Sequence, residues 1–379
     1  MKKLSFKERV FYSVICNENR VYKYWYTRFL LAGADLDRIR RVVKRIRGWR
    51  DWCGEWYREG CALEGMAEQA LAKGNKESAK GWFHEAVACF HIGQHFYFLD
   101  DEIKARSLEK IWDLYPKAIS LYEENRPLRV EVPFRGAFIP GYLRLQPAAG
   151  RPLVVQINGL DNLKETEQHA IGRMLFDAGF NAIAFDGPGQ GEMLKSMAMI
   201  PDYQESVSCL IDWIESHYGG YIDMERIGAV GFSMGGYFAP LAAAYDERIK
   251  CVVANGGPAD LSFLRRAGKA NPILLRGLPH VAGTETLKES VEKLRYDIGE
   301  APAVKVPLLV QHSGRDRIIP EGRKHAEKFM NWAAGEKEMR FFPDGEHVCA
   351  NYLDEVLPGA VDWFKRHLGG EVMPPLNAA

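Results

Sequence analysis

The chain has 379 residues, of which 47% are hydrophobic and 26% charged, and its 50 basic side chains balance 50 acidic ones. This length and composition are typical of a globular protein with one large domain and a smaller accessory one. A balanced charge gives no indication of a nucleic-acid partner.

The cysteines and the N-terminus indicate the compartment. The seven cysteines include no Cys-x-x-Cys and no paired Cys/His spacing, which argues against a disulfide framework and a zinc site. The N-terminus begins with lysines, but Lys7, Glu8 and Arg9 interrupt any apolar core of a signal peptide. No segment approaches the roughly 18 apolar residues of a membrane span. We therefore expect a soluble, cytoplasmic protein without metal, cofactor or membrane partner.

Residues 1–127 show helical rather than strand periodicity. Gly74 and Asn75 separate two alanine-rich segments, which predicts a helical hairpin like a tetratricopeptide unit. Because only one such unit is present, an all-helical cap domain is favoured over a solenoid. Aromatic residues at helical spacing are typical of a core, although they could also line a pocket for an aromatic substrate: Trp25, Tyr26, Trp49, Trp52, Trp56, Trp82, Phe83, Phe96, Tyr97 and Phe98.

Residues 128–368 alternate short β-branched runs with helical segments. RVEVPF and IPGYLRLQP predict an antiparallel hairpin, and six further strands follow: PLVVQING, NAIAFDG, RIGAVGF, KCVVANGG, VPLLVQHSG and EMRFFPDG. This order predicts an α/β-hydrolase fold with an eight-stranded, mostly parallel sheet. We expect residues 258–300 to form a helical insertion near the site and residues 369–379 a loose tail.

GFSMG, residues 231–235, matches the nucleophile motif G-x-S-x-G. An apolar run precedes it and small residues follow, as in the strand-turn-helix elbow that exposes a catalytic serine. Side chains at Gly231 and Gly235 should collide with neighbouring elements in so tight a turn. The alternative is that Ser233 only caps a strand-to-helix turn.

A serine nucleophile requires a base and an acid, which in this fold follow it in the order acid, then histidine. Asp316 follows the seventh predicted strand and His347 the eighth. Asp316 could instead pair with its neighbours Arg315 or Arg317. Asp344 and Glu346 could act as local anchors, although the sequence PDG explains Asp344 as a turn residue. We expect most of the ten histidines on the surface and His312 as the one rival base.

The oxyanion hole should combine two backbone N–H groups. Met234, next to the nucleophile, supplies one, and Leu160 in QINGLDN supplies the other. Asp161 beside it is interpreted as a helix cap or a partner of Lys164, or else as a proton donor or hydrogen-bonding group for substrate.

FDGPGQGE, residues 185–192, does not open a phosphate-binding helix as a dinucleotide fingerprint would. It is better interpreted as the fourth-strand loop, in which Asp186 and the glycines shape the turn behind the elbow. Cys349 is interpreted as an apolar filler rather than a redox switch.

The segments NAIAFDGPGQGEM, GFSMGGYFAPLAAA, GRD and GEHVCAN, behind ACFHIGQHFYF, resemble a group of α/β hydrolases. That group includes 2,6-dihydroxypseudooxynicotine hydrolase, fungal Yg1-type polyketide-shortening hydrolases and the fermentation-respiration switch proteins. The resemblance covers nearly the whole chain. It implies that Ser233, Asp316 and His347 form the triad and that the N-terminal helices cover the site and contribute to a homodimer. Asp161 stands where we expect a glutamate in the nicotine-pathway enzyme.

The leading hypothesis is a cofactor-independent serine hydrolase acting on a small-molecule carboxylic ester. Because members of the group also cleave carbon-carbon bonds next to a ketone, an acyl-phenol, 1,3-diketone or polyketide-like substrate is the alternative. A non-catalytic regulatory protein is a third hypothesis, which a complete triad argues against. A peptidase is less favoured, because oligopeptidases of this fold usually carry a β-propeller and no four-strand repeat is present.

Overall fold

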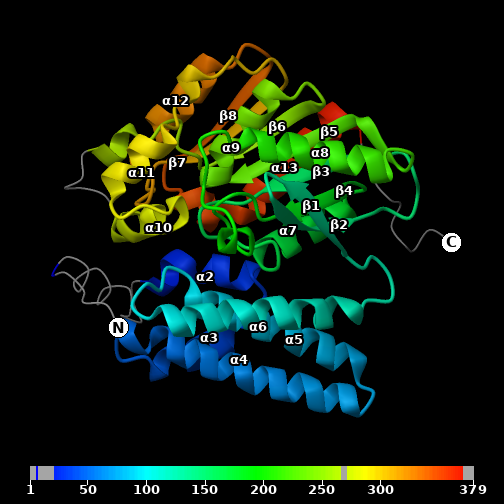
Figure 1. Ribbon diagram of the computed structural model, residues 1–379, viewed down its shortest axis with the longest axis vertical. Coiled ribbons are helices and arrows are strands. Elements are labelled where there is room, and N and C mark those ends of the chain that lie inside the picture. The colour runs from blue at the N-terminus through cyan, green and yellow to red at the C-terminus, as the bar shows by residue number, and fades with distance from the viewer. Residues whose placement is uncertain (1–5, 7–20, 266–270, 370–379) are drawn as a thin grey trace. The chain divides into compact units, whose positions relative to one another are not determined.

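The computed structural model describes residues 6, 21–265 and 271–369 (Figure 1). Cys16, the N-terminal lysines and residues 370–379 of the expected tail lie outside this description. The chain divides into two compact units. The first contains Met1–Arg126 together with Glu165–Ala170, and the second contains Pro127–Lys164 and Ile171–Ala379.

The first unit is helical in its described residues. Its helices are α2 (Val21–Leu31), α3 (Leu36–Arg45), α4 (Trp49–Ala72), α5 (Lys76–Gln94) and α6 (Asp101–Ser120). The predicted hairpin is confirmed as α4 and α5, which are joined through Gly74 at φ +79° and packed together along their length. Eight of the ten aromatic residues singled out above are buried, as the core interpretation predicts: Trp25, Trp49, Trp52, Trp56, Phe83, Phe96, Tyr97 and Phe98.

The second unit is built on one eight-stranded sheet in the order β1-β2-β4-β3-β5-β6-β7-β8. The first two strands and the β2/β4 pair are antiparallel, and all other neighbours are parallel. The predicted α/β-hydrolase sheet is therefore confirmed. Its strands are β1 (Leu128–Phe134), β2 (Ala137–Arg144), β3 (Arg151–Ile157), β4 (Asn181–Phe185), β5 (Ile222–Phe232), β6 (Ile249–Asn255), β7 (Leu308–Ser313) and β8 (Lys337–Phe342).

Helices pack on this sheet and connect its strands. α9 (Met234–Tyr245) lies on β5 and β6, α12 (Gly322–Trp332) on β7 and β8, and α13 (Leu353–Leu368) on β5, β6 and β7. The strands are also connected by α7 (Glu167–Asp177), α8 (Gln204–Tyr218) and the short turn η1 (Met193–Lys195), whereas η4 (His347–Tyr352) and α13 follow the last strand. The excursion after β6 contains η2 (Ser262–Arg265), α10 (Pro272–Ala282), α11 (Leu287–Leu294) and η3 (Ile298–Glu300).

The register of the parallel strands brings their carboxyl ends to one edge. Ile157 of β3 pairs with Phe185 of β4 and Gly231 of β5, and Ser313 of β7 pairs with Phe342 of β8. The loops that follow these strands must therefore meet at that edge, where open α/β sheets bind their ligands.

Candidate active site

Ser233 occupies the turn between β5 and α9 in a strained backbone conformation. Its φ of +56° and ψ of −123° lie outside the regions that non-glycine residues ordinarily adopt. Two backbone hydrogen bonds hold it there: its N–H donates to Asn255 O at 2.8 Å, and its carbonyl accepts from Gly236 N–H at 2.8 Å. The turn presents the hydroxyl at the end of the strand, as a nucleophile elbow does.

The two glycines of the motif are required because the turn leaves no room for a side chain at either position. A Cβ on Gly231 would overlap the carbonyl oxygen of Gly235, and a Cβ on Gly235 would overlap the carbonyl oxygen of Ile157. The steric prediction for both positions is confirmed. Strands β3 and β5 and helix α9 can therefore approach closely only because these two positions lack side chains.

The structure brings Ser233, His347 and Asp316 together. His347 Nε2 lies 2.9 Å from Ser233 Oγ, and its Nδ1 lies 2.7 Å from Asp316 Oδ2. All three residues are buried, with 7 to 9% of their surface exposed. Because Nδ1 faces a carboxylate, it carries the proton, and Nε2 is left free to accept one from the serine hydroxyl.

Asp316 is fixed by more than the histidine. Its Oδ1 accepts hydrogen bonds from the backbone N–H groups of Ile318 and Ile319, each at 2.8 Å. Burial raises the pKa of this carboxyl, but nearby His347 and the Ile319 N–H lower it by a larger amount. The net pKa therefore lies below the ordinary value of 3.8. The two N–H anchors were not foreseen from the sequence, since any residue type could have supplied them.

The competing acids, Asp344 and Glu346, lie in other surroundings. Arg315 pairs with Asp344, with 2.6 Å between Nη2 and Oδ1. Glu346 is half-buried, and burial raises the pKa of its carboxyl despite the charge of Arg317. Among the described residues, Asp316 is the carboxylate that His347 Nδ1 contacts, at 2.7 Å.

His312, the rival base, is held in a structural role. Its Nε2 lies 3.1 Å from Gly257 O and its Nδ1 accepts from the Ser313 N–H at 2.9 Å, which uses both ring nitrogens. Burial lowers its pKa below 6.5 despite the nearby Asp316. The expectation that most histidines lie on the surface was wrong, because five of the ten are buried: His91, His95, His312, His325 and His347.

The loop that carries His347 is itself strained. Val348 and Cys349 follow in succession with φ +54°, a left-handed conformation that is unusual for a β-branched residue. Gly256 makes room for this turn, because a Cβ there would lie 2.9 Å from Val348 Cα. Cys349 is fully buried and burial raises the pKa of its thiol to about 12, so the group stays protonated, in keeping with an apolar filler.

The loop after β3, residues 158–164, carries Leu160, whose N–H we expect to bind the oxyanion, and it is called the oxyanion loop after that expectation. It lies against the elbow, since a Cβ on Gly159 would be 3.1 Å from Ser233 Cβ and 2.9 Å from Phe232 O. Met234 provides the first N–H of α9. The two donors expected from the sequence therefore belong to two segments that lie next to Ser233, the oxyanion loop and the start of α9.

A buried charge pair anchors the far end of the oxyanion loop. Lys164 Nζ donates to Asp186 Oδ2 at 2.7 Å and to Glu192 Oε2 at 3.0 Å, and the side chains of Lys164 and Asp186 are fully buried. Asn158 Nδ2 also donates to Asp186 Oδ1 at 2.9 Å. Asp186 thus ties both ends of the loop to the segment after β4. Asp161 is partly exposed, and its part in catalysis stays a prediction.

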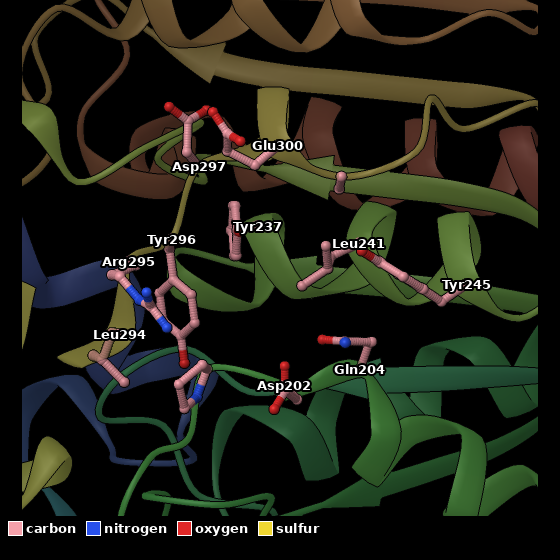
Figure 2. A pocket seen from close by; sticks show the side chains of 12 residues that line it. Asp202, Gln204, Tyr237, Leu241, Tyr245, Leu294, Arg295, Tyr296, Asp297 and Glu300 are labelled. Atoms are coloured by element: carbon pink, nitrogen blue, oxygen red, sulfur yellow. The ribbon is translucent and has the colours of Figure 1, made fainter. Parts of the chain in front are cut away.

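A pocket of about 410 Å³ lies elsewhere in the second unit, on one face of α9 (Figure 2). Tyr237, Leu241 and Tyr245 line it at four-residue intervals along the helix, and Tyr296 lies beside Tyr237, with 5.1 Å between their ring centroids. The pocket shares no residue with the cluster of Ser233, His347 and Asp316 or with the oxyanion loop.

Among the described residues, no group of three or more His, Cys, Asp or Glu side chains is placed to bind a metal ion. No helix in the described part of the chain combines the length and apolar character needed to cross a bilayer.

The chain is similar to known hydrolases. The prolyl oligopeptidase family profile matches residues 173–371. A 2,6-dihydropseudooxynicotine hydrolase of Paenarthrobacter nicotinovorans is 29% identical over 86% of this chain and 88% of its own length. Hydrolase pyiE of Pyricularia grisea is 29% identical over 59% of this chain and 54% of its own length, so this chain matches about half of that relative. The resemblance predicted from the motifs is confirmed.

Solved structures show the same fold. The crystal structure of 2,6-dihydroxy-pseudo-oxynicotine hydrolase has a TM-score of 0.81 and 24% identity, over 90% of this chain and 95% of that one. An esterase of Pyrobaculum calidifontis has a TM-score of 0.53 and 16% identity, over 71% of this chain and 94% of that one.

Proposed function

Because the chain belongs to the prolyl oligopeptidase family, we propose that Ser233, His347 and Asp316 form its catalytic triad and that it hydrolyses a carboxylic ester. The chain is a hydrolase of the serine α/β-hydrolase type. The observation that supports the triad is the continuous hydrogen-bonded chain, 2.9 Å from serine to histidine and 2.7 Å from histidine to aspartate.

The first half of the reaction forms an acyl-enzyme. Ser233 Oγ attacks the substrate carbonyl carbon while His347 Nε2 takes the hydroxyl proton. The N–H groups of Leu160 and Met234 stabilise the oxyanion of the tetrahedral intermediate. When the carbonyl re-forms, the bond to the leaving alcohol breaks and His347 returns the proton to its oxygen.

The second half repeats these steps with water. His347 removes a proton from a water molecule whose oxygen attacks the acyl carbon, and the acid leaves as Ser233 recovers its proton. Asp316 holds the imidazole in the tautomer with Nδ1–H and stabilises the imidazolium in both halves. The protein's own residues supply every proton-transfer group.

Carbon-carbon bond hydrolysis is the second candidate. The relative named for 2,6-dihydropseudooxynicotine matches 86% of this chain, which includes part of the helical unit. With a ketone substrate the same attack would expel a carbanion, which needs a flanking carbonyl or phenol for stabilisation and a proton from His347 or another acid. Asp161 is our candidate for that additional acid or for a hydrogen bond to substrate.

A substrate panel distinguishes the candidates. Purified protein is incubated with p-nitrophenyl esters, lactones, acyl-phenols and 1,3-diketones, and product masses identify the broken bond. We expect turnover of esters. Cleavage of acyl-phenols or diketones with no ester turnover would replace the ester proposal, and no turnover of any class would favour a regulatory protein.

We also propose that residues 1–127 act as a substrate-selecting cap, that the chain is a homodimer and that it works in the cytoplasm. Deleting residues 1–126 would remove Arg28 and His91, the partners of buried Glu167 at 2.7 and 3.3 Å, so the shortened chain should lose stability as well as selectivity. A shortened chain with an unchanged specificity profile would contradict the cap. Light scattering tests the dimer, and cell fractionation tests the location.

A further inference from the structure

Gln190, in the loop after β4, uses its whole side-chain amide. Nε2 donates to Asn158 O at 2.8 Å and to Gly159 O at 2.9 Å. Oε1 accepts from the Gly187 N–H at 3.0 Å and from Tyr203 Oη at 2.7 Å. The residue is 1% exposed, so these four bonds satisfy both donors and both acceptor sites without water.

The orientation of this amide is imposed by its neighbours. A hydroxyl and an N–H both point at Oε1, so Nε2 must face the two carbonyls. Packing fixes the position of Tyr203, because it is fully buried and its ring stacks on Phe238 with 3.7 Å between centroids and 5° between planes. The chain of contacts therefore runs from α9 through Tyr203 and Gln190 to the oxyanion loop.

The bond to Gly159 bears directly on the oxyanion hole. The carbonyl of Gly159 and the N–H of Leu160 belong to one planar trans peptide unit, so they point in opposite directions. Holding the carbonyl on the Gln190 side fixes the N–H on the other side. This peptide unit lies beside the nucleophile, as the 3.1 Å approach between a Cβ on Gly159 and Ser233 Cβ requires.

We propose that Gln190 is a positioning residue that aligns the Leu160 N–H toward the oxyanion by hydrogen-bonding the carbonyls of Asn158 and Gly159. The inference rests on the proposed serine mechanism. Only a neutral amide of this length can donate to two carbonyls while accepting two bonds. A glutamate would place negative charge against both carbonyl oxygens, and a methionine would leave them unpaired.

The test compares two buried glutamines. Gln146 also donates through Nε2 to two carbonyls, those of Phe176 and Phe180 at 2.6 and 3.0 Å, but away from the oxyanion loop. We expect Gln190→Met to lower kcat on p-nitrophenyl butyrate by on the order of 100-fold, the size of effect that a misplacement of about 1 Å produces, with KM changed less than about threefold. Gln146→Met should keep kcat within about threefold.

The readout specific to the oxyanion hole is the preference for the ester over its thionoester. Sulfur accepts hydrogen bonds poorly, so an enzyme with an aligned hole favours oxygen. Gln190→Met should reduce this preference on the order of tenfold and Gln146→Met should not. An equal loss of kcat in both variants with an unchanged preference would overturn the proposal.

Tyr203→Phe provides a milder variant if Gln190→Met does not fold. It removes only the hydroxyl that orients Oε1 and keeps the ring stacked on Phe238. The ester preference should fall in the same direction, and an unchanged preference in the folded variant would overturn the proposal. Labelling of Ser233 by a phosphorylating inhibitor is measured alongside, so that failure of the serine mechanism is recognised separately.

Discussion

Arg315 is paired with Asp344 through a contact of 2.6 Å, although it stands next in sequence to Asp316. The two candidate aspartates, Asp316 and Asp344, therefore have different tasks. Asp316 is buried and accepts from His347 and two backbone N–H groups, whereas Asp344 is 60% exposed. An exposed ion pair of this kind adds little to stability.

This division predicts unequal effects of two conservative substitutions. In Asp316→Asn the amide can donate to Nδ1 and favour the wrong tautomer of His347, so kcat should fall about 10⁴-fold. In Asp344→Asn only a surface pair is lost, and kcat should stay within about threefold. Steady-state kinetics on p-nitrophenyl butyrate compare the two. Equal losses would contradict the assignment of the acid.

The crowded elbow predicts the cost of a single methyl group. Gly235→Ala would force a Cβ onto the carbonyl of Ile157 and should destabilise the fold by more than about 3 kcal/mol. Gly81 in α5 has no atom within 4 Å of a built Cβ, and Gly81→Ala should stabilise by about 0.5 to 1 kcal/mol. Urea unfolding measures both. A well-folded Gly235→Ala variant would mean that the elbow is less tightly packed than described.

His325 predicts a pH dependence of stability. Burial and, second to it, the neighbouring His312 lower the pKa of His325 from 6.5 to about 4, although the charges of Asp260, Asp316 and Glu321 act in the opposite direction. In the unfolded chain His325 therefore binds a proton below pH 6.5, whereas in the folded chain it binds one only below about pH 4. The contribution is fully present above pH 6.5 and is lost as the pH falls toward 4, by about 2 to 3 kcal/mol at pH 4.5.

The matching experiment replaces the titrating ring. His325→Gln keeps an acceptor for the Ala259 N–H, which His325 Nδ1 now accepts at 3.1 Å, and should flatten the curve of unfolding free energy against pH between 6.5 and 4.5. His217→Gln, at an exposed histidine, serves as the control and should keep the slope of the native protein. Parallel curves for all three proteins would show that His325 titrates normally.

Much of the fold could be predicted because each β-strand has a recognisable pattern in its own local sequence. Apolar runs bounded by glycine and proline gave all eight strands, and the hairpin before them gave the antiparallel edge. The elbow and the loops of Asp316 and His347 followed from their positions after β5, β7 and β8. Chain order carries this information, so no tertiary contact had to be known.

Contacts between distant loops could not be predicted in this way. Gln190 donates a hydrogen bond to the carbonyl of Asn158, which lies 32 residues away in the sequence. The periodicity of apolar residues gives no indication of such a contact. The burial of His325 depends likewise on how β6, β7 and α12 pack. The inclusion of Glu165–Ala170 in the helical unit follows from tertiary packing that the sequence pattern did not mark.

The central claim is that Ser233 is the nucleophile, and intact-protein and peptide mass spectrometry after treatment with diethyl p-nitrophenyl phosphate tests it most directly. We predict that one diethylphosphoryl group attaches to Ser233 as ester hydrolysis is lost, and that Ser233→Ala, with a native circular dichroism spectrum, has neither label nor turnover. Ser206→Ala, at a buried serine of α8, should be labelled and inhibited like the native protein. Label on another residue, or undiminished turnover in Ser233→Ala, would contradict the account.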